Sequence, residues 1–294
     1  WFREGAEATA AILHVRAGRL CDAHSFHFRA EGEQDEALSS FLVQHYAEGA
    51  YFPGEILLSM EVRDAAVMAS LLSDRAGSRV RVKTPRAGER ARLVNLAGRN
   101  ASESHRMRKE KEAAYDELSS RLASLCHLPK PPRRIEGFDI SNLSGMEAVG
   151  SMVAFVGGKA AKRWYRKFAV RGLEGQDDFA MMEQVVRRRF GHDEDFGGPP
   201  DLVLIDGGKG QLSSAITALR SAGAAFVPVI ALAKERMRGG ETVFRERIFL
   251  PGRKNPVVLP PYDPALLLLM RVRDEAHRFA LSFHRARRAK KMLG

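Results

Sequence analysis

The chain has 294 residues, of which 45% are hydrophobic and 28% charged, so it can bury cores and is not a disordered protein. Its net charge of +11 suits a polyanionic partner, although a solvated basic surface is the alternative. No apolar run approaches the roughly 20 residues of a membrane span. The chain has only two cysteines, and they lack metal-ligand spacing. This argues against a disulfide scaffold and indicates a reducing cytoplasm.

Hydrophobic periodicity and turn residues predict an α/β arrangement in residues 1–134. The expected order is a hairpin, a helix, a strand, a second helix, a second strand and a long polar helix. The corresponding ranges are 8–29, 36–49, 55–60, 63–76, 78–84 and 88–127. Pro131 and Pro132 cannot continue the last helix, so we place a domain boundary beside them.

The pattern beyond residue 134 is that of a ribonuclease H-like fold. Three antiparallel strands are expected first, followed by helix, strand, helix, strand, a hairpin-like stretch and a final helix. The ranges are 134–141, 148–156, 162–170, 177–190, 200–206, 211–222, 227–233, 242–259 and 263–289. Turns at Ser144-Gly145 and Gly157-Gly158 are expected to join the first three strands.

The first half repeats this order in reduced form and has no carboxylate equivalent to Asp139 of the second half. We therefore expect a degenerate, catalytically empty ribonuclease H-like α/β domain over residues 1–98. A connecting helix and Pro-rich linker over 99–134 would lead to a ribonuclease H-like endonuclease domain over 135–294. A generic α/β domain is the alternative for the first half.

Four side chains carry the chemistry that the second half predicts: Asp139, Asp178, Asp206 and His277. Asp139 interrupts an apolar strand, where a buried charge needs a partner. That partner could be a metal ion; the alternative is that Asp139 caps the turn that follows the strand. Asp206 ends another apolar strand, at the edge where α/β sheets bind ligands, although a plain strand-to-helix turn would look the same. Carboxylates are the ligands that magnesium prefers, so their convergence would build a metal site.

Two of the assignments have strong structural alternatives. Asp177 and Asp178 open a helix, where acids are favoured as caps; we assign the cap to Asp177 and the metal to Asp178, with the reverse left open. His277 lies one helical turn after Asp274, which could orient its imidazole, but a lone helical histidine is more often structural.

Basic residues near these acids are candidates for contacts with DNA phosphates. Lys209 follows Asp206 closely, and because no Ser or Thr follows it, a nucleotide-binding loop is excluded. The final helix adds five more candidates, for which a solvated tail is the alternative. They are Arg278, Arg285, Arg287, Arg288 and Lys290.

These motifs, in this order, resemble the UvrC family, the incision subunits of bacterial nucleotide excision repair. Matching phrases include DDFAMMEQVVRRRFG, LVLIDGGKGQL and VVLPPYDPALLLLMRVRDEAHRFALSFHR. The resemblance implies a metal-dependent DNA endonuclease that cuts on the 5′ side of a lesion in damaged double-stranded DNA, with UvrB as partner through the UvrA/UvrB system. Asp139, Asp178, Asp206 and His277 fall on the family's catalytic positions. The three aspartates would hold Mg²⁺ or Mn²⁺.

The chain departs from the whole family protein in its extent. It begins at Trp1 without an initiating methionine, so we expect a fragment that lacks the N-terminal nuclease, the UvrB-binding segment and the tandem helix-hairpin-helix module. A DNA- and partner-binding module that is inactive in this truncated form is therefore the alternative function.

Overall fold

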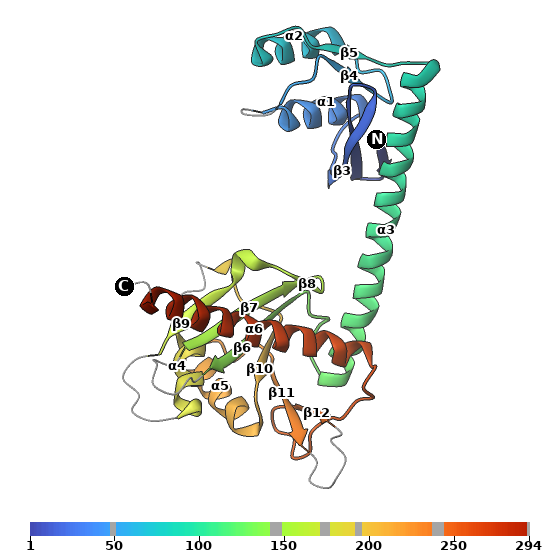
Figure 1. Ribbon diagram of the computed structural model, residues 1–294. Helices are drawn as coiled ribbons and strands as arrows, with labels where there is room; N and C mark the ends of the chain where they lie inside the picture. Colours follow the sequence, from blue (N-terminus) through green and yellow to red (C-terminus); the bar gives the residue numbers. More distant parts are fainter. Residues whose placement is uncertain (48–50, 142–148, 171–176, 192–195, 237–243, 293–294) are drawn as a thin grey trace. The chain divides into compact units, whose positions relative to one another are not determined.

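The structure is a computed structural model that describes residues 1–47, 51–141, 149–170, 177–191, 196–236 and 244–292. It divides into two compact units, Trp1–Lys111 and Glu112–Gly294, which are described separately (Figure 1). The division falls inside helix α3 (Gly88–Cys126). It lies within residues 99–134, the range expected from the sequence for the connecting segment. Those two domain boundaries stay predictions.

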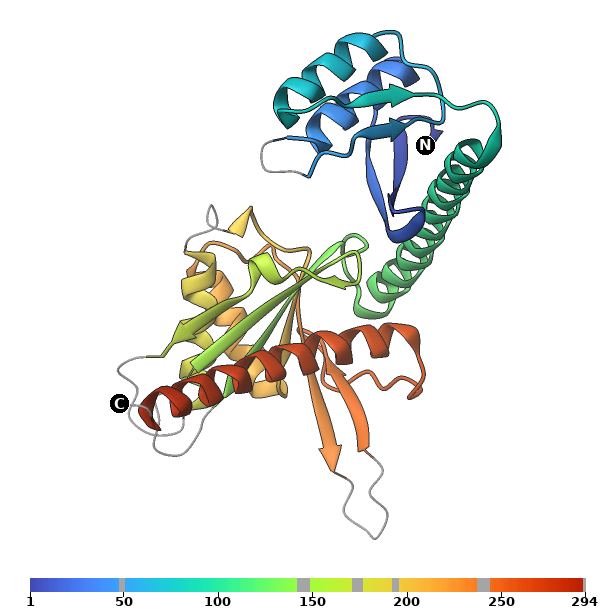
Figure 2. The same cartoon turned by 45° about the horizontal axis from the view of Figure 1, so that its top comes forward.

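The first unit has the predicted order of a hairpin followed by alternating helices and strands (Figure 2). Its elements are β1 (Phe2–Glu4), β2 (Glu7–Arg16), β3 (Arg19–Arg29), α1 (Gln34–His45), β4 (Glu55–Leu57), α2 (Ala65–Ala76) and β5 (Arg81–Lys83). Strands β1, β2 and β3 form an antiparallel sheet, while β4 and β5 form a separate parallel pair. Ala17 and Gly18 have φ of 50° and 74°, as a two-residue hairpin turn requires.

The core of the first unit lies between the two helices and the parallel strand pair. Leu38 and Leu42 of α1 meet Leu72 of α2 there, because apolar residues recur on one face of each helix. Thr9 of the hairpin contacts buried His105 of α3, with 3.0 Å between the hydroxyl oxygen and Nδ1. The unit therefore has an apolar core of its own and a polar seam along α3.

One mixed sheet of seven strands organises the second unit (Figure 1). Its strands are β6 (Arg134–Ser141), β7 (Val149–Val156), β8 (Lys159–Ala160), β9 (Arg166–Ala169), β10 (Leu202–Asp206), β11 (Val229–Arg236) and β12 (Phe244–Phe249). The order is β12-β11-β10-β6-β7-β8, and β9 also pairs with β7. Strands β6, β10 and β11 run parallel, and β7 and β12 are antiparallel to their neighbours. This confirms the predicted ribonuclease H-like order.

The third predicted strand, 162–170, is wrong in its first part. A 3-10 turn, η1 (Lys162–Trp164), occupies that stretch, and the short strands β8 and β9 pair with opposite ends of β7. The Trp164 ring lies under the guanidinium carbons of Arg134 and Arg163, at 4.8 and 5.3 Å, so the chain leaves the sheet to stack this indole. Gly157 and Gly158 form the predicted turn with positive φ, whereas Ser144-Gly145 lies outside the described residues.

Helices cover both faces of the sheet. Helices α4 (Asp178–Phe190) and α5 (Lys209–Ser221) lie on one face, and α6 (Pro264–Met292) lies on the other together with the C-terminal part of α3. Strand β6 alternates between them: Phe138 belongs to the core under α4 and α5, and Ile135 to the core under α6. Both faces of the central strands are therefore apolar, which explains their continuous hydrophobic runs.

A buried ion pair fixes α4 to strand β6. Glu136 and Arg189 are both 0% exposed, and Arg189 donates to the carboxylate through Nε at 2.9 Å and Nη2 at 3.0 Å. Arg134 adds a third donor at 2.6 Å. The geometry satisfies a charge that would otherwise be costly at this depth.

Candidate metal centre

Strand register sets Asp139 beside Asp206. In the parallel pair of β6 and β10, Phe138 is level with Ile205, so the two acids follow at the same height of the sheet. Both lie at an even spacing from residues in the core under α6, namely Ile135 and Leu204. The side chains therefore leave the sheet on the same face, at the carboxyl ends of adjacent strands.

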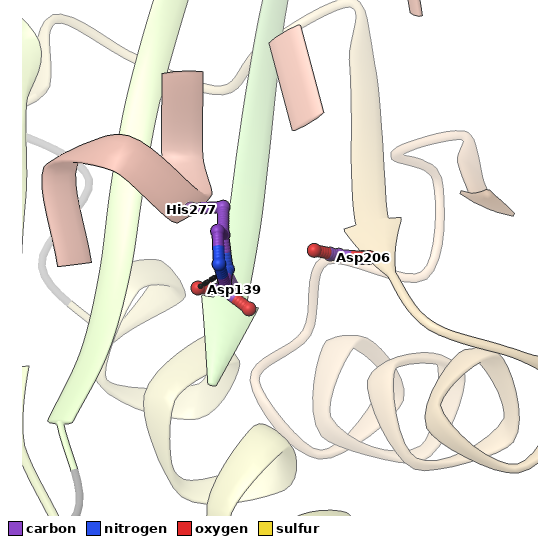
Figure 3. A group of neighbouring side chains, drawn as sticks. All are labelled: Asp139, Asp206 and His277. Atoms are coloured by element: carbon purple, nitrogen blue, oxygen red, sulfur yellow. Dashed lines mark ion pairs between the residues drawn. The ribbon is translucent and has the colours of Figure 1, made fainter. Parts of the chain in front are cut away.

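Helix α6 crosses this face and delivers His277 (Figure 3). The Nδ1 atom of His277 lies 3.3 Å from Oδ2 of Asp139. One ligand atom each from Asp139, Asp206 and His277 lies within 4.8 Å of the others. Among the described residues, no other group of three His, Cys, Asp or Glu side chains comes this close together. The arrangement offers two carboxylates and an imidazole to one cation.

Asp139 is the most deeply buried member of this group, with 5% of its surface exposed. Its Oδ2 has no well-formed hydrogen bond among the described residues and lies at ion-pair distance from the His277 ring. Burial raises the pKa of Asp139, His277 opposes that rise, and the charge of Asp178 adds to it. An orphaned buried carboxylate oxygen is costly unless a cation binds it.

The ionised form of Asp206 is also disfavoured by its surroundings. Burial and the neighbouring charge of Asp139 raise the pKa of Asp206 to about 6, while Arg273, His277 and Lys234 oppose the rise. Two carboxylates at this separation repel each other, and a divalent cation between them would stabilise both ionised forms. The donor set therefore fits a metal ion.

The helix α4 N-terminus separates the roles of its two acids. Asp177 caps the helix, and its Oδ1 accepts hydrogen bonds from the backbone nitrogens of Phe179 at 3.1 Å and Ala180 at 3.0 Å. Asp178 is the next residue, and its charge acts on Asp139, although it is outside the group of three. Asp177 is thus the cap, as predicted, and the assignment of Asp178 to the metal stays a prediction.

The predicted phosphate contacts differ in how far the structure describes them. Lys209 is the first residue of α5 and is exposed. Arg278 is also exposed, but its Nε lies 2.6 Å from Oε2 of Glu275, so it already has an acidic partner. The other four have a helical backbone in α6, and their side chains lie outside the described residues: Arg285, Arg287, Arg288 and Lys290.

Two cations near Asp206 were missed by sequence reasoning. Arg273 is buried on α6 and is bonded to Glu246 of β12 and to Asp274. Lys234 stands on β11, two residues beyond the position level with Asp206. A charged residue at the end of the apolar run VIALA was the available signal for Lys234, whereas nothing local in the sequence marks the contact between Arg273 and Glu246.

Comparison with known families decides the relationship. The model described as the UvrC RNAse H endonuclease domain matches residues 123–281, and the one described as the UvrC Ribonuclease H-like domain matches residues 1–108. The chain belongs to the UvrC family. Both halves therefore have the ribonuclease H-like fold that the sequence predicts, and the described residues of the first half contain no comparable metal-binding group.

Curated UvrC relatives match over nearly all of this chain. UvrABC system protein C of Geobacter metallireducens is 43% identical over 98% of this chain and 48% of its own length. The protein of the same name from Anaeromyxobacter sp. is 39% identical over 97% of this chain and 47% of its own. This UvrC chain thus spans about half the length of the curated relatives it matches.

Solved structures give more distant likenesses. Endonuclease V from Streptomyces avermitilis aligns with 63% of this UvrC chain and 93% of its own, at 15% identity and a TM-score of 0.34. The catalytic domain of human Endonuclease V aligns with 64% and 98%, at 12% identity and a TM-score of 0.37. Within the described part of this UvrC chain, no helix combines the length and apolar character of a membrane span.

Proposed function

We propose that this chain is a divalent-metal-dependent DNA endonuclease of nucleotide excision repair, which hydrolyses a phosphodiester on the 5′ side of a lesion. The observation that carries the proposal is the buried Oδ2 of Asp139, which has no hydrogen-bond donor and lies beside His277 in the group that also contains Asp206. Membership of the UvrC family supports the repair context.

The donor set favours Mg²⁺ or Mn²⁺. Asp139 and Asp206 supply hard oxygen ligands, and the imidazole of His277 suits Mn²⁺ better than Mg²⁺. Asp178, on the neighbouring helix α4, would complete the ligand set. A metal bound there supplies an activated water and a Lewis acid for the phosphate oxygens.

The protein's own groups have separate tasks in this proposal. Asp139, buried on a central strand, would hold the metal ion at a fixed position. Because 56% of the His277 side chain is exposed, its ring can exchange a proton with solvent or with the departing oxygen. The basic surface, to which Lys209 and the end of α6 contribute, would hold the DNA backbone.

Substrate and partners follow from the family. We infer that the substrate is damaged double-stranded DNA in the cytoplasm and that UvrB, within the UvrA/UvrB system, presents it. The relatives named UvrABC system protein C support this inference. A binding module without activity is the second candidate, because this chain spans 48% of the length of such a relative.

A nicking assay on lesion-containing duplex DNA tests the proposal. Each strand is labelled in turn, and the chain is incubated with Mg²⁺, Mn²⁺ or a chelator, with and without UvrA and UvrB. We expect metal-dependent nicks on the 5′ side of the lesion. Asp139→Asn keeps the side chain's shape and should abolish cutting while DNA affinity is retained, whereas exposed Asp74→Asn is the matched control.

The outcomes separate the two candidates. Cutting by Asp139→Asn at the wild-type rate would show that the site is wrongly assigned. Wild-type DNA binding without cutting in any metal, even with both partners present, would favour the binding module.

A further inference from the structure

Lys234 lies on the same face of the sheet as the metal centre. In the parallel pair of β10 and β11, Asp206 is level with Leu232, and Lys234 is two residues further along the same strand. Leu232 belongs to the core under α6, so the even spacing directs Lys234 to the α6 side as well. Lys234 therefore extends the row of side chains that contains Asp206, just beyond the end of the core.

The acid opposite Lys234 on the neighbouring strand already has another partner. Glu246 of β12 is directly opposite Lys234 in the antiparallel pair, where a cross-strand ion pair would ordinarily form. Instead, the Glu246 carboxylate is bonded to Nη1 of buried Arg273. Arg273 thus binds Glu246 from the helix side, and Glu246 forms no ion pair with Lys234.

The Lys234 ammonium is exposed and forms no hydrogen bond or ion pair with any described residue. Its charge nevertheless acts on Asp206, for which it is one of three stabilising cations. Two other lysines of the second unit do have partners: Lys130 lies 2.6 Å from Asp201, and Lys167 lies over the Phe279 ring. Lys234 therefore combines an unpaired charge with electrostatic reach to the metal centre.

We propose that Lys234 binds a phosphate oxygen of the DNA strand beside the metal centre. This inference rests on the proposed function and names a substrate-binding residue for that same site. A pair of close carboxylates repels a phosphate, so a free ammonium at the rim is needed to hold the backbone in place. An ammonium is a compact point charge that suits a phosphate oxygen, which is approached from many directions.

The salt dependence of DNA binding tests the contact without any cutting. Affinity for a duplex is measured in chelator over a range of salt concentrations for wild type, Lys234→Met, Lys234→Arg and Lys159→Met. Lys159 is the matched control because it is exposed on β8, at the far side of the sheet. We expect Lys234→Met to weaken binding about tenfold and to reduce the salt slope by about one, with Lys234→Arg close to wild type.

A second measurement separates a phosphate contact from an effect on Asp206. If Lys234 acts only through Asp206, Lys234→Met changes Mn²⁺ affinity in calorimetry but leaves the salt slope at the wild-type value, which would overturn the proposal. If Lys234 holds the phosphate, Lys234→Met also lowers the single-turnover cutting rate on the order of 100-fold, and Lys159→Met does not.

The wild-type chain distinguishes failure of this inference from failure of the proposed function. Wild type that cuts DNA, together with a Lys234→Met variant that binds and cuts equally well, would overturn the Lys234 contact alone. Wild type that binds DNA but never cuts would overturn the proposed function, and the salt slopes would still decide the contact. Wild type that does not bind DNA would overturn both.

Discussion

Gly137 of β6 and Val272 of α6 are in direct contact, and no side chain fits between them. A methyl group on Gly137 would lie 2.6 Å from Cγ1 of Val272 and 3.3 Å from its backbone oxygen. The absence of a Cβ lets α6 lie directly on the central strand. We expect this close approach to set the height at which His277, five residues after Val272, meets Asp139.

Gly137→Ala should therefore damage stability and site together. We expect the free energy of unfolding to fall by about 1–3 kcal/mol because α6 is pushed off the strand. Mn²⁺ affinity should fall with it, since His277 moves away from Asp139. Urea unfolding and calorimetry provide the two measurements.

Val272→Ala in the Gly137→Ala background removes the nearest clashing atom and should recover part of both losses. Gly98→Ala is the control for the substitution itself, because a Cβ at Gly98 meets nothing within 4 Å in helix α3. An unchanged Mn²⁺ affinity in Gly137→Ala would show that the helix contact does not position His277.

Asp206→Asn should stabilise the fold when no metal is present. Burial and the charge of Asp139 both disfavour the ionised Asp206 carboxylate, as its raised pKa of about 6 indicates. Removing that charge should increase the free energy of unfolding by about 1–3 kcal/mol at pH 8 in chelator. Added Mn²⁺ should then stabilise wild type but not the variant, as thermal unfolding would reveal.

Asp201→Asn is the control with the opposite expected sign. Asp201 accepts hydrogen bonds from the backbone nitrogens of Arg133 at 3.0 Å and Arg134 at 2.8 Å, and it pairs with Lys130. Its loss should destabilise the fold. A lower stability of Asp206→Asn in chelator would contradict the view that the two acids of the centre repel each other.

The buried pair of Glu136 and Arg189 should behave as a unit. Arg189→Met leaves the buried Glu136 carboxylate with Arg134 as its remaining cation and should cost about 3 kcal/mol in the free energy of unfolding. The double variant Glu136→Leu with Arg189→Met should be more stable than either single variant, because both members of the fully buried pair lose their charge. Exposed Arg187→Met is the control and should change stability by less than about 0.5 kcal/mol in urea unfolding.

Asp263 should make stability depend on acidic pH. The hydrogen bond from Arg121 lowers the pKa of Asp263, which also accepts from the backbone nitrogen of Ala265 at the start of α6. Because the folded pKa is below the unfolded value of about 3.9, this contribution is fully present above that value. It is lost as the pH falls through the folded pKa.

Asp263→Ala should therefore cost about 1 kcal/mol at pH 7 and less at pH 2, as urea unfolding at the two pH values would show. Asp263→Asn keeps an oxygen that can cap the helix. Its free energy of unfolding should therefore stay close to the wild-type value, while the dependence of that free energy on pH should be lost. An equal cost of Asp263→Ala at both pH values would exclude the ionised carboxylate as the source.

Sequence reasoning located Asp139 and Asp206 because both follow apolar runs, and the ends of parallel strands meet at one edge of a sheet. It could not decide between Asp177 and Asp178, since either acid suits a helix start; only the hydrogen bonds to Phe179 and Ala180 show which of them is the cap. The broken third strand was missed because its aromatic and basic residues also suit a strand.

The cations around Asp206 illustrate what a single sequence does not contain. Lys234 forms no ion pair with a described residue, and Glu246, opposite it on the next strand, is bound by Arg273 from a helix 27 residues later. Which of the two cations pairs with Glu246 depends both on the pairing of the strands and on the position of the helix. Neither is encoded in the local pattern around any one of the three residues.

The two faces of strand β6 carry acids in different surroundings. Glu136 on one face is neutralised by Arg189 and holds α4, while Asp139 on the other face has a carboxylate oxygen without a hydrogen bond among the described residues. A deletion of one residue between them would change their spacing from three residues to two, so that both carboxylates would lie on the same face of the sheet. The distance of three residues between Glu136 and Asp139 is thus itself a constraint on how this strand can change.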